Sequence, residues 1–299
     1  MRFGGHQTFH IRDGWLPKAL RILLSDTPEI LSDTYASDQL GVGNNMVKSI
    51  YHWLLATKLA YREQGEGKRL SKVLAPTDLS RAVYESDPYC ALPETWWALH
   101  LNLIHHREHA ETWYWFFNNF GLERFDRGLA LRRLEKHIET DAGGNTPQTK
   151  TLERDFGILL SSYATDLPSK ATDPEEDNWC PFRQLELLTF YSQSNSYQVH
   201  RRHRSIPSGI MMYAIETTLA VNGVESEDIR FFELSRLPGN PIRAFLLPTD
   251  AFFEQLLLMS QQLPESDFQL TGLAGDRQIR MRRQPAHSWI ERAYKERAA

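Results

Sequence analysis

Residues 35–74 read YASDQLGVGNNMVKSIYHWLLATKLAYREQGEGKRLSKVL, and this stretch decides how the N-terminal part of the chain folds. A short helical segment runs into a turn punctuated by Gly41 and Gly43. A longer helix is predicted to start at Asn44 or Asn45, since asparagine is favoured at helix N-termini. Two short strands, YREQ and RLSKV, follow around a Gly-Glu-Gly turn. Helix, turn, second helix and basic hairpin is the order of a winged helix-turn-helix, whose second helix enters the major groove of DNA.

The second helix has two distinct faces. Val47, Ile50 and Leu54 recur at helical spacing and are predicted to face the core. Asn45 is predicted to read base edges and Asn44 to cap the helix. The full set of DNA contacts predicted for this region is Asn44, Asn45, Lys48, Ser49, His52, Arg62, Lys68 and Arg69. The alternative is a helical hairpin with a surface β-hairpin, because winged helices also serve as protein-interaction modules.

Charge favours nucleic-acid binding only locally. The whole chain has a formal net charge of -4 and a pI near 6.3, which excludes a uniformly basic coat. Between residues 44 and 75, however, lysines and arginines outnumber the two carboxylates of Glu63 and Glu66. Affinity for a phosphate backbone is therefore predicted to come from a patch.

The bulk properties set wide bounds. The chain has 299 residues, enough for two domains with separate cores. No apolar run approaches the ~20 residues of a membrane helix, and the first residues lack the apolar core of a signal peptide. Cys90 and Cys180 form no CxxC pair, so neither a disulfide scaffold nor a structural zinc site is indicated. We therefore expect a cytoplasmic protein with no membrane partner.

The fold class predicted is mainly α, an α+β chain with small β-hairpins, in which an N-terminal winged helix-turn-helix precedes a helical C-terminal domain. Helices are predicted over residues 77–140, and the aromatic cluster at residues 113–117 is expected to be buried, because it would otherwise promote aggregation. A run of carboxylates predicts an exposed linker. The domains expected are residues 1–164, an acidic linker at residues 165–178, and residues 179–299.

The C-terminal domain has a predicted order of elements of its own, and the sequence contains no internal repeat. Residues 226–237 are predicted as a helix, and IRAFLL, residues 242–247, as a strand. The helix TDAFFEQLLLMSQQL and a hairpin made of FQLTG and RQIRMRR follow. Helix, strand, helix and hairpin predict a second winged-helix-like unit.

Six segments, in family order, resemble a bacterial domain family of formerly unknown function. That family occurs in DNA phosphorothioation operons and includes the SspB-type component of Ssp systems. The chain departs from the family pattern at Cys90 and at the histidines after Leu103. The matching segments are FGGHQTFHIRDGWLPKAL, LGVGNNMVKSIYHW, DPYCALPETWWALHLNL, ERDFGILLSSY, CPFRQLELL and LTGLAGDRQIR.

The resemblance implies a nicking endonuclease that acts on double-stranded DNA in phosphorothioate modification and anti-phage defence. Nicking would let sulfur replace a non-bridging phosphate oxygen, with sulfur-transfer proteins and an ATPase as partners. A non-catalytic DNA-binding subunit or transcriptional regulator is the alternative, and a protein-interaction scaffold is a third class.

The catalytic residues predicted are His6, Arg12 and Asp13. A histidine can move a proton to or from a phosphodiester, and an arginine can hold the phosphate. His6 and Arg12 lie in a segment that matches the family, whereas His10 departs from it. The alternative is a structural arm in which these residues support the helix that begins near Asp13.

Two other polar clusters stand out. HHREH places His105 and His109 at i and i+4, as in some zinc sites, but no third ligand is evident and a solvated polar turn is predicted. The run HRRHR supplies Arg201, Arg202 and Arg204, which are predicted either to hold a DNA phosphate or to lie in a solvated loop.

Nuclease and nucleotide-hydrolase motifs are not recognisable. The sequence contains no convincing PD-(D/E)xK arrangement, HNH core or paired carboxylates for two metal ions. The sequence therefore identifies no metal ligand, and it leaves open whether nicking depends on a divalent metal ion. No GxxxxGK[ST] loop is present either, so any ATP hydrolysis belongs to a partner.

Overall fold

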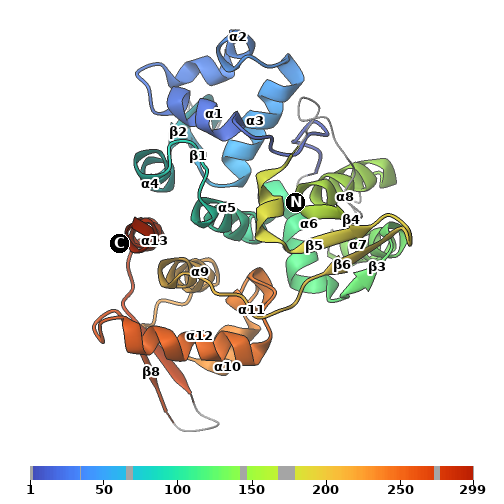
Figure 1. The fold of residues 1–299 in the computed structure, drawn as a ribbon. Helices are drawn as coiled ribbons and strands as arrows, with labels where there is room; N and C mark the ends of the chain where they lie inside the picture. The colour runs from blue at the N-terminus through green and yellow to red at the C-terminus, as the bar shows by residue number, and fades with distance from the viewer. Residues whose placement is uncertain are drawn as a thin grey trace. The chain divides into compact units, whose positions relative to one another are not determined.

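Two compact units, Met1–His200 and Arg201–Ala299, make up the chain in the computed structural model (Figure 1). Both are mainly helical with small sheets, which confirms the mainly α, α+β fold class expected from the sequence. Within the described part of the chain, no helix combines the length and apolarity needed to cross a membrane. The structure describes residues 3–33, 35–64, 70–141, 147–167, 179–272 and 277–298.

A turn joins helices α2 (Ala36–Leu40) and α3 (Asn44–Ala56) near the start of the first unit. Gly41 ends α2 in the left-handed region (φ 65°), where a residue without Cβ is favoured. Gly43, in extended conformation, is the N-cap of α3 and provides no side-chain cap. Asn44 is therefore the first helical residue and not the predicted cap. Helix α1 (Trp15–Leu23) and the 3-10 helix η1 (Pro28–Ser32) precede α2 and α3.

The two faces of α3 only partly follow the predicted division. Ile50 and Leu54 are buried, and Val47 is half-buried. Ser49 and His52, predicted as exposed DNA contacts, are 0% and 6% exposed. Both lie beneath the N-terminal residues, which the helical periodicity of α3 alone does not reveal. The exposed positions of the first two turns include Asn44, Asn45 and Lys48.

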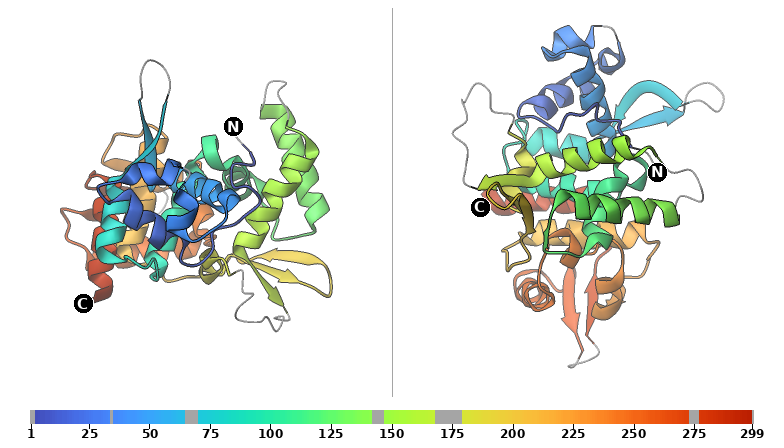
Figure 2. Two further views of the ribbon diagram at one scale, coloured as in Figure 1. Left: turned by 90° about the horizontal axis from the view of Figure 1, so that it is seen from above. Right: turned by 90° about the vertical axis from the view of Figure 1, so that its right-hand side faces the viewer.

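A two-stranded antiparallel hairpin follows α3. Strand β1 (Ala60–Gln64) pairs with β2 (Leu70–Pro76), with Ala60 opposite Pro76. In both views of Figure 2 its strands project away from the helices of the first unit. The predicted contacts Lys68 and Arg69 lie outside the described residues.

Helices and aromatic side chains build the core of the first unit. The predicted burial of the aromatic cluster is confirmed, because Trp113, Trp115, Phe116 and Phe117 are all at most 7% exposed. The elements are α4 (Asp78–Ser86), α5 (Pro93–His105), α6 (Arg107–Trp115), the π-helix η2 (Phe116–Phe120), α7 (Arg127–Asp141), α8 (Thr149–Tyr163) and the 3-10 helix η3 (Pro181–Leu185).

A four-stranded sheet completes the first unit, in the order β3-β6-β5-β4. Strand β4 runs parallel to β5, with Ala164 opposite Leu188, so the two sides of the expected linker belong to one sheet. The division between units falls after His200 and not at residues 165–178, of which 168–178 lie outside the described residues. The strands are β3 (Arg124–Phe125), β4 (Ala164–Leu167), β5 (Leu188–Tyr191) and β6 (Ser196–Val199).

The second unit is organised around α9, most of whose residues are buried. Helix α13 packs directly on it, and a Cβ at Gly209 would lie 2.7 Å from the carbonyl oxygen of Trp289. The second unit also contains a three-stranded sheet in the order β7-β9-β8. Strand β7 precedes α12 in the sequence and pairs with the hairpin β8-β9 that follows α12. The elements are α9 (Ser208–Val221), β7 (Asp228–Arg230), α10 (Phe231–Arg236), α11 (Pro241–Ala244), α12 (Thr249–Gln262), β8 (Phe268–Thr271), β9 (Gln278–Met281) and α13 (Ala286–Ala298).

Two predictions for this unit were wrong. IRAFLL begins in the short helix α11 and not in a strand, because the Asn240 side chain accepts from the N–H of Arg243 and Pro241 occupies the first helical position. The strand lies earlier, at β7, within a segment predicted as a helix. Burial alternates along this strand, with the side chain of Ile229 buried. The pairing of β7 with β9 outweighs the helical pattern of the local sequence.

Candidate nucleic-acid interface and histidine cluster

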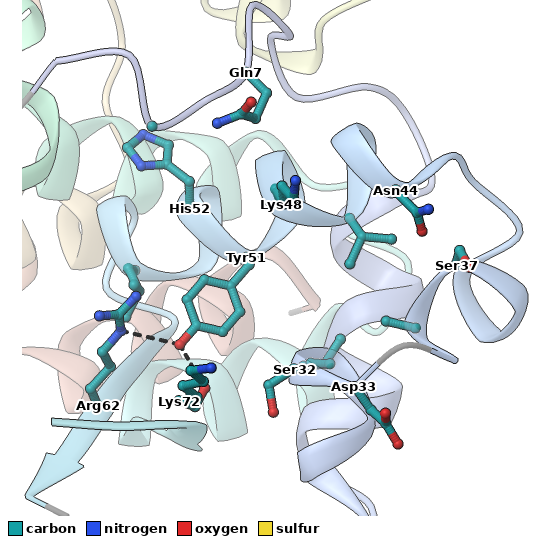
Figure 3. A pocket seen from close by; sticks show the side chains of 15 residues that line it. Gln7, Ser32, Asp33, Ser37, Asn44, Lys48, Tyr51, His52, Arg62 and Lys72 are labelled. Carbon is teal, nitrogen blue, oxygen red and sulfur yellow. Dashed lines mark hydrogen bonds between the residues drawn. The ribbon is translucent and has the colours of Figure 1, made fainter.

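A cavity of about 750 Å³ opens beside α3 (Figure 3). Lys48 comes from α3 itself, whereas Arg62 and Lys72 come from the two strands of the hairpin. Among the described residues that line it, Asp33 is the one carboxylate. The cavity is therefore lined by more cationic than anionic side chains, as an anion-binding surface requires.

A hydrogen-bonded link ties the hairpin to α3 at this cavity. The Tyr51 hydroxyl donates to the carbonyl oxygen of Lys72 at 2.6 Å and accepts from Nε of Arg62 at 3.1 Å. The guanidinium of Arg62 also lies 5.2 Å from the centroid of the Tyr51 ring, within range of a cation–π interaction. These bonds hold α3 and the hairpin together, so that their cations lie on one surface, as Figure 3 shows.

The N-terminal residues cover another side of α3. Trp53 Nε1 donates to the carbonyl oxygen of Phe9 at 3.0 Å, and Ser49 Oγ donates to the same oxygen at 3.4 Å. Gly5 approaches His52 so closely that a Cβ at this glycine would lie 2.3 Å from His52 Nδ1. The backbone at Gly5 therefore approaches a histidine of α3 where a Cβ would not fit.

Asp155, on α8, holds this arm in place. Its carboxylate accepts from the N–H of Gly4 and from Nε2 of His6, both at 2.7 Å, and from Oγ1 of Thr112 at 2.8 Å. Since His6 Nδ1 accepts from the N–H of Thr8, Nε2 must carry the hydrogen given to Asp155. The His6 ring is 1% exposed, and both its nitrogens are engaged.

The other two predicted catalytic residues lie nearer the surface. The guanidinium of Arg12 is half-buried, 5.5 Å from the ring centroid of Phe9 and 5.6 Å from that of Trp15. Asp13 is exposed and precedes Gly14, the left-handed N-cap of α1. Neither side chain shares a described hydrogen bond with His6, and the role of both residues stays a prediction.

The histidines at the α5–α6 junction are less solvated than the sequence predicts. His105 is 7% exposed, while His106 and His109 are half-buried. The ring of His106 lies 4.8 Å from that of His109, which in turn lies 6.1 Å from that of His52. His106, Glu108 and His109 each place a potential ligand atom within 4.8 Å of the other two. A second cavity, of about 530 Å³, is lined by these three residues and by Lys58 and Arg62.

Known proteins share this sequence pattern and architecture. A family described as "Protein of unknown function (DUF4007)" matches residues 3–294. The chain belongs to the DUF4007 family. Two solved structures, "SspB crystal structure" and "Magnesium ion-bound SspB crystal structure", each superpose with a TM-score of 0.83 at 25% identity, covering 99% of this chain and 87% of theirs. No curated protein matches the sequence. The resemblance drawn from the six sequence segments is thus confirmed.

In this DUF4007 chain the predicted DNA contacts fall in both units. Arg201, Arg202 and Arg204 belong to the second, where Arg201 Nη1 donates to the carbonyl oxygen of Leu247 at 3.2 Å. Their role as a phosphate clamp stays a prediction. Tyr51 and Asp155 carry no local sequence signal, because both act through partners distant in the chain. For His106 a signal existed, since His106 and His109 lie at i and i+3 and share one helical turn.

Lys58 occupies a position that normally favours glycine. It follows α3 with φ 57°, and the N–H groups of Lys58 and Leu59 donate to the carbonyls of Leu55 and Leu54, which is a Schellman motif. We expect Lys58→Gly to raise the free energy of unfolding by about 1 kcal/mol, because it removes the Cβ from a left-handed residue. Urea denaturation measures this gain. Lys58→Met keeps the Cβ and is the control, and an equal gain in both variants would contradict the backbone explanation.

The pKa of His105 leads to a pH-dependent prediction. Burial, with smaller contributions from the charges of Lys58 and His100, lowers this pKa to about 3. Below the ordinary pKa of about 6.5 the unfolded chain binds a proton that the folded chain excludes, so stability falls from pH 6.5 towards pH 3. From pH 7 to pH 5 we expect a loss of about 2 kcal/mol from this residue. His105→Leu should remove this part of the loss in urea titrations, whereas replacing the exposed His203 should not.

Proposed function

We propose that this chain is the DNA-binding, nicking component of a phosphorothioate modification system. The observation that carries the proposal is the cationic cavity between α3 and the hairpin, in a chain whose fold matches SspB over 99% of its length. Double-stranded DNA in the cytoplasm is the expected substrate, with sulfur-transfer proteins and an ATPase as partners, as the sequence resemblance implies.

In this proposal α3 and the hairpin act as a winged helix. The exposed Asn44 and Asn45 lie at the N-terminal end of α3, which is the end that meets base edges in this motif. An asparagine can pair with adenine through two hydrogen bonds. Lys48, Arg62 and Lys72 contact phosphates and fix the register of the protein on the duplex. Their convergence from three elements supports this assignment.

Nicking requires a group that moves a proton and a cation that stabilises the phosphorane-like transition state. Arg12 is half-buried and Asp13 is exposed, whereas His6 is buried and both its ring nitrogens are already hydrogen-bonded. We therefore assign His6 to positioning and keep Arg12 and Asp13 as residues of the nicking site. The exposed rim of the histidine cluster is a second source of such groups.

Supercoiled plasmid and a labelled duplex test the proposal together. A nickase shifts the duplex in a gel and converts the plasmid to open circles in the presence of divalent metal. A transcriptional regulator or non-catalytic subunit shifts the duplex and leaves the plasmid supercoiled. A protein-interaction scaffold does neither, and that result would refute the DNA-binding proposal as well as nicking.

A further inference from the structure

His106, Glu108 and His109 form a compact group at the start of α6. One backbone turn sets their arrangement, because the carbonyl oxygen of His106 accepts from the N–H of His109 at 3.2 Å and from that of Ala110 at 2.8 Å. Ala110 then leaves the helical conformation (φ -144°, ψ 48°), so this turn is distinct from the rest of α6. The potential ligand atoms lie within 4.8 Å of one another.

The ring of His106 is in the state that a metal requires. Its Nδ1 lies 3.1 Å from the carbonyl oxygen of Ala56. A carbonyl can only accept, so Nδ1 carries the hydrogen and Nε2 keeps its lone pair. Metal-binding histidines commonly donate their second ring nitrogen to a backbone carbonyl in this way.

We propose that His106, Glu108 and His109 bind a divalent first-row transition-metal ion, with Zn²⁺ the expected occupant. Two imidazoles and one carboxylate suit such ions, whereas Mg²⁺ prefers oxygen ligands and retains water. The proposal goes beyond the proposed function, because metal binding here does not require that the chain bind or nick DNA.

The site has an open side. Three protein ligands leave room for water or for a substrate oxygen, as in catalytic zinc sites. The cavity of about 530 Å³ lies there, and Lys58 and Arg62 line it. These cations suit a phosphate oxygen placed on the ion. The ion would then polarise a phosphodiester, a step that does rest on the proposed nicking function.

A second cluster of potential metal ligands in the first unit offers a comparison. Glu111, His137 and Asp141 also bring their ligand atoms within 4.8 Å of one another. Arg107, however, donates to both carboxylates, with bonds of 2.9 and 2.8 Å to Glu111. A guanidinium therefore already neutralises this second cluster, and we assign no metal to it.

Titration of the full chain with Co²⁺ tests the site through its visible absorption. We expect one equivalent of Co²⁺ to give the bands of a four- or five-coordinate ion, Zn²⁺ to abolish them at equimolar amounts, and millimolar Mg²⁺ to leave them unchanged. Absence of these bands, or displacement by Mg²⁺ as readily as by Zn²⁺, would overturn the proposal.

Variants assign the bands to these ligands. His109→Ala should weaken Co²⁺ binding at least about 100-fold, and Glu108→Gln, at an exposed position that leaves folding intact, about tenfold. Asp141→Asn is the matched control in the second cluster and should bind Co²⁺ as the natural chain does. Bands that survive in both His109→Ala and Glu108→Gln would place the ion elsewhere.

Lys58→Met provides a signature that a purely structural role would not produce. The charge of Lys58 acts on His106, so its removal should tighten Co²⁺ binding about tenfold. Unchanged or weaker binding in this variant contradicts the site. Because none of these titrations contains DNA, a chain that binds Co²⁺ but does not nick would refute the proposed function and leave the metal site standing.

Discussion

Replacing Asp155 by alanine is expected to lower the free energy of unfolding by about 3–5 kcal/mol. The carboxylate is buried and accepts three hydrogen bonds, from Gly4, His6 and Thr112. Truncation leaves all three donors without their acceptor. The loss is measured by urea denaturation, and because the arm loses its anchor, the N-terminal residues should also be cleaved faster by proteases.

Two further variants separate hydrogen bonding from general damage to α8. Asp155→Asn retains one oxygen for Gly4 and His6, while its amide can donate to the hydroxyl of Thr112, so its loss should be only about 1–2 kcal/mol. Glu153→Ala, at an exposed position on the same helix, should change stability by less than about 0.5 kcal/mol. Equal losses in the alanine and asparagine variants at residue 155 would argue against this role for the carboxylate.

Removing the cations of the cavity together is expected to have the largest effect on DNA binding. The combination of Lys48→Ala, Arg62→Ala and Lys72→Ala should lower affinity roughly 100-fold near 0.1 M salt. It should also reduce the slope of log affinity against log salt by about 2.7, since each lost phosphate contact reduces it by about 0.9. Fluorescence anisotropy across a salt series gives both quantities.

The matched control removes three cations from α7 and α8. Arg132, Lys136 and Lys150 are all exposed, and their replacement changes the net charge equally. The control should retain most of the slope. If both triple variants lost the same slope, net charge and not the cavity would govern binding. Melting temperatures are needed alongside, because Arg62 also bonds to Tyr51.

The proposed DNA-binding surface and the proposed metal site lie next to each other. The cationic cavity and the histidine cavity share Leu55 and Arg62, and His52 of the first lies beside His109 of the second. If DNA binds as proposed, a DNA strand held at Lys48 and Lys72 would run close to the proposed metal ion. Loss of binding in the triple variant with normal Co²⁺ absorption would show that the two surfaces act separately.

Local sequence predicted the order of the elements over residues 35–74, but not the four-stranded sheet of the same unit. Glycines in the turn, apolar spacing in α3 and the alternating residues around a Gly-Glu-Gly turn were sufficient to predict helix, turn, helix and hairpin. The dense aromatic cluster was predicted to be buried, as it is. Such features depend on backbone preference and hydrophobic periodicity, which act over a few residues.

Tertiary structure decided which polar residues can act. Ser49 and His52 carry the pattern of an exposed face, yet the arm from Gly4 to His10 covers them. His6 bonds to Asp155, 149 positions along the chain, and no periodicity relates the two. His106 gains its proton-donor role from Ala56 on another helix. Function in this chain depends on burial and on partners brought together by packing, and those long-range contacts are the part of the fold that local sequence does not encode in any single segment.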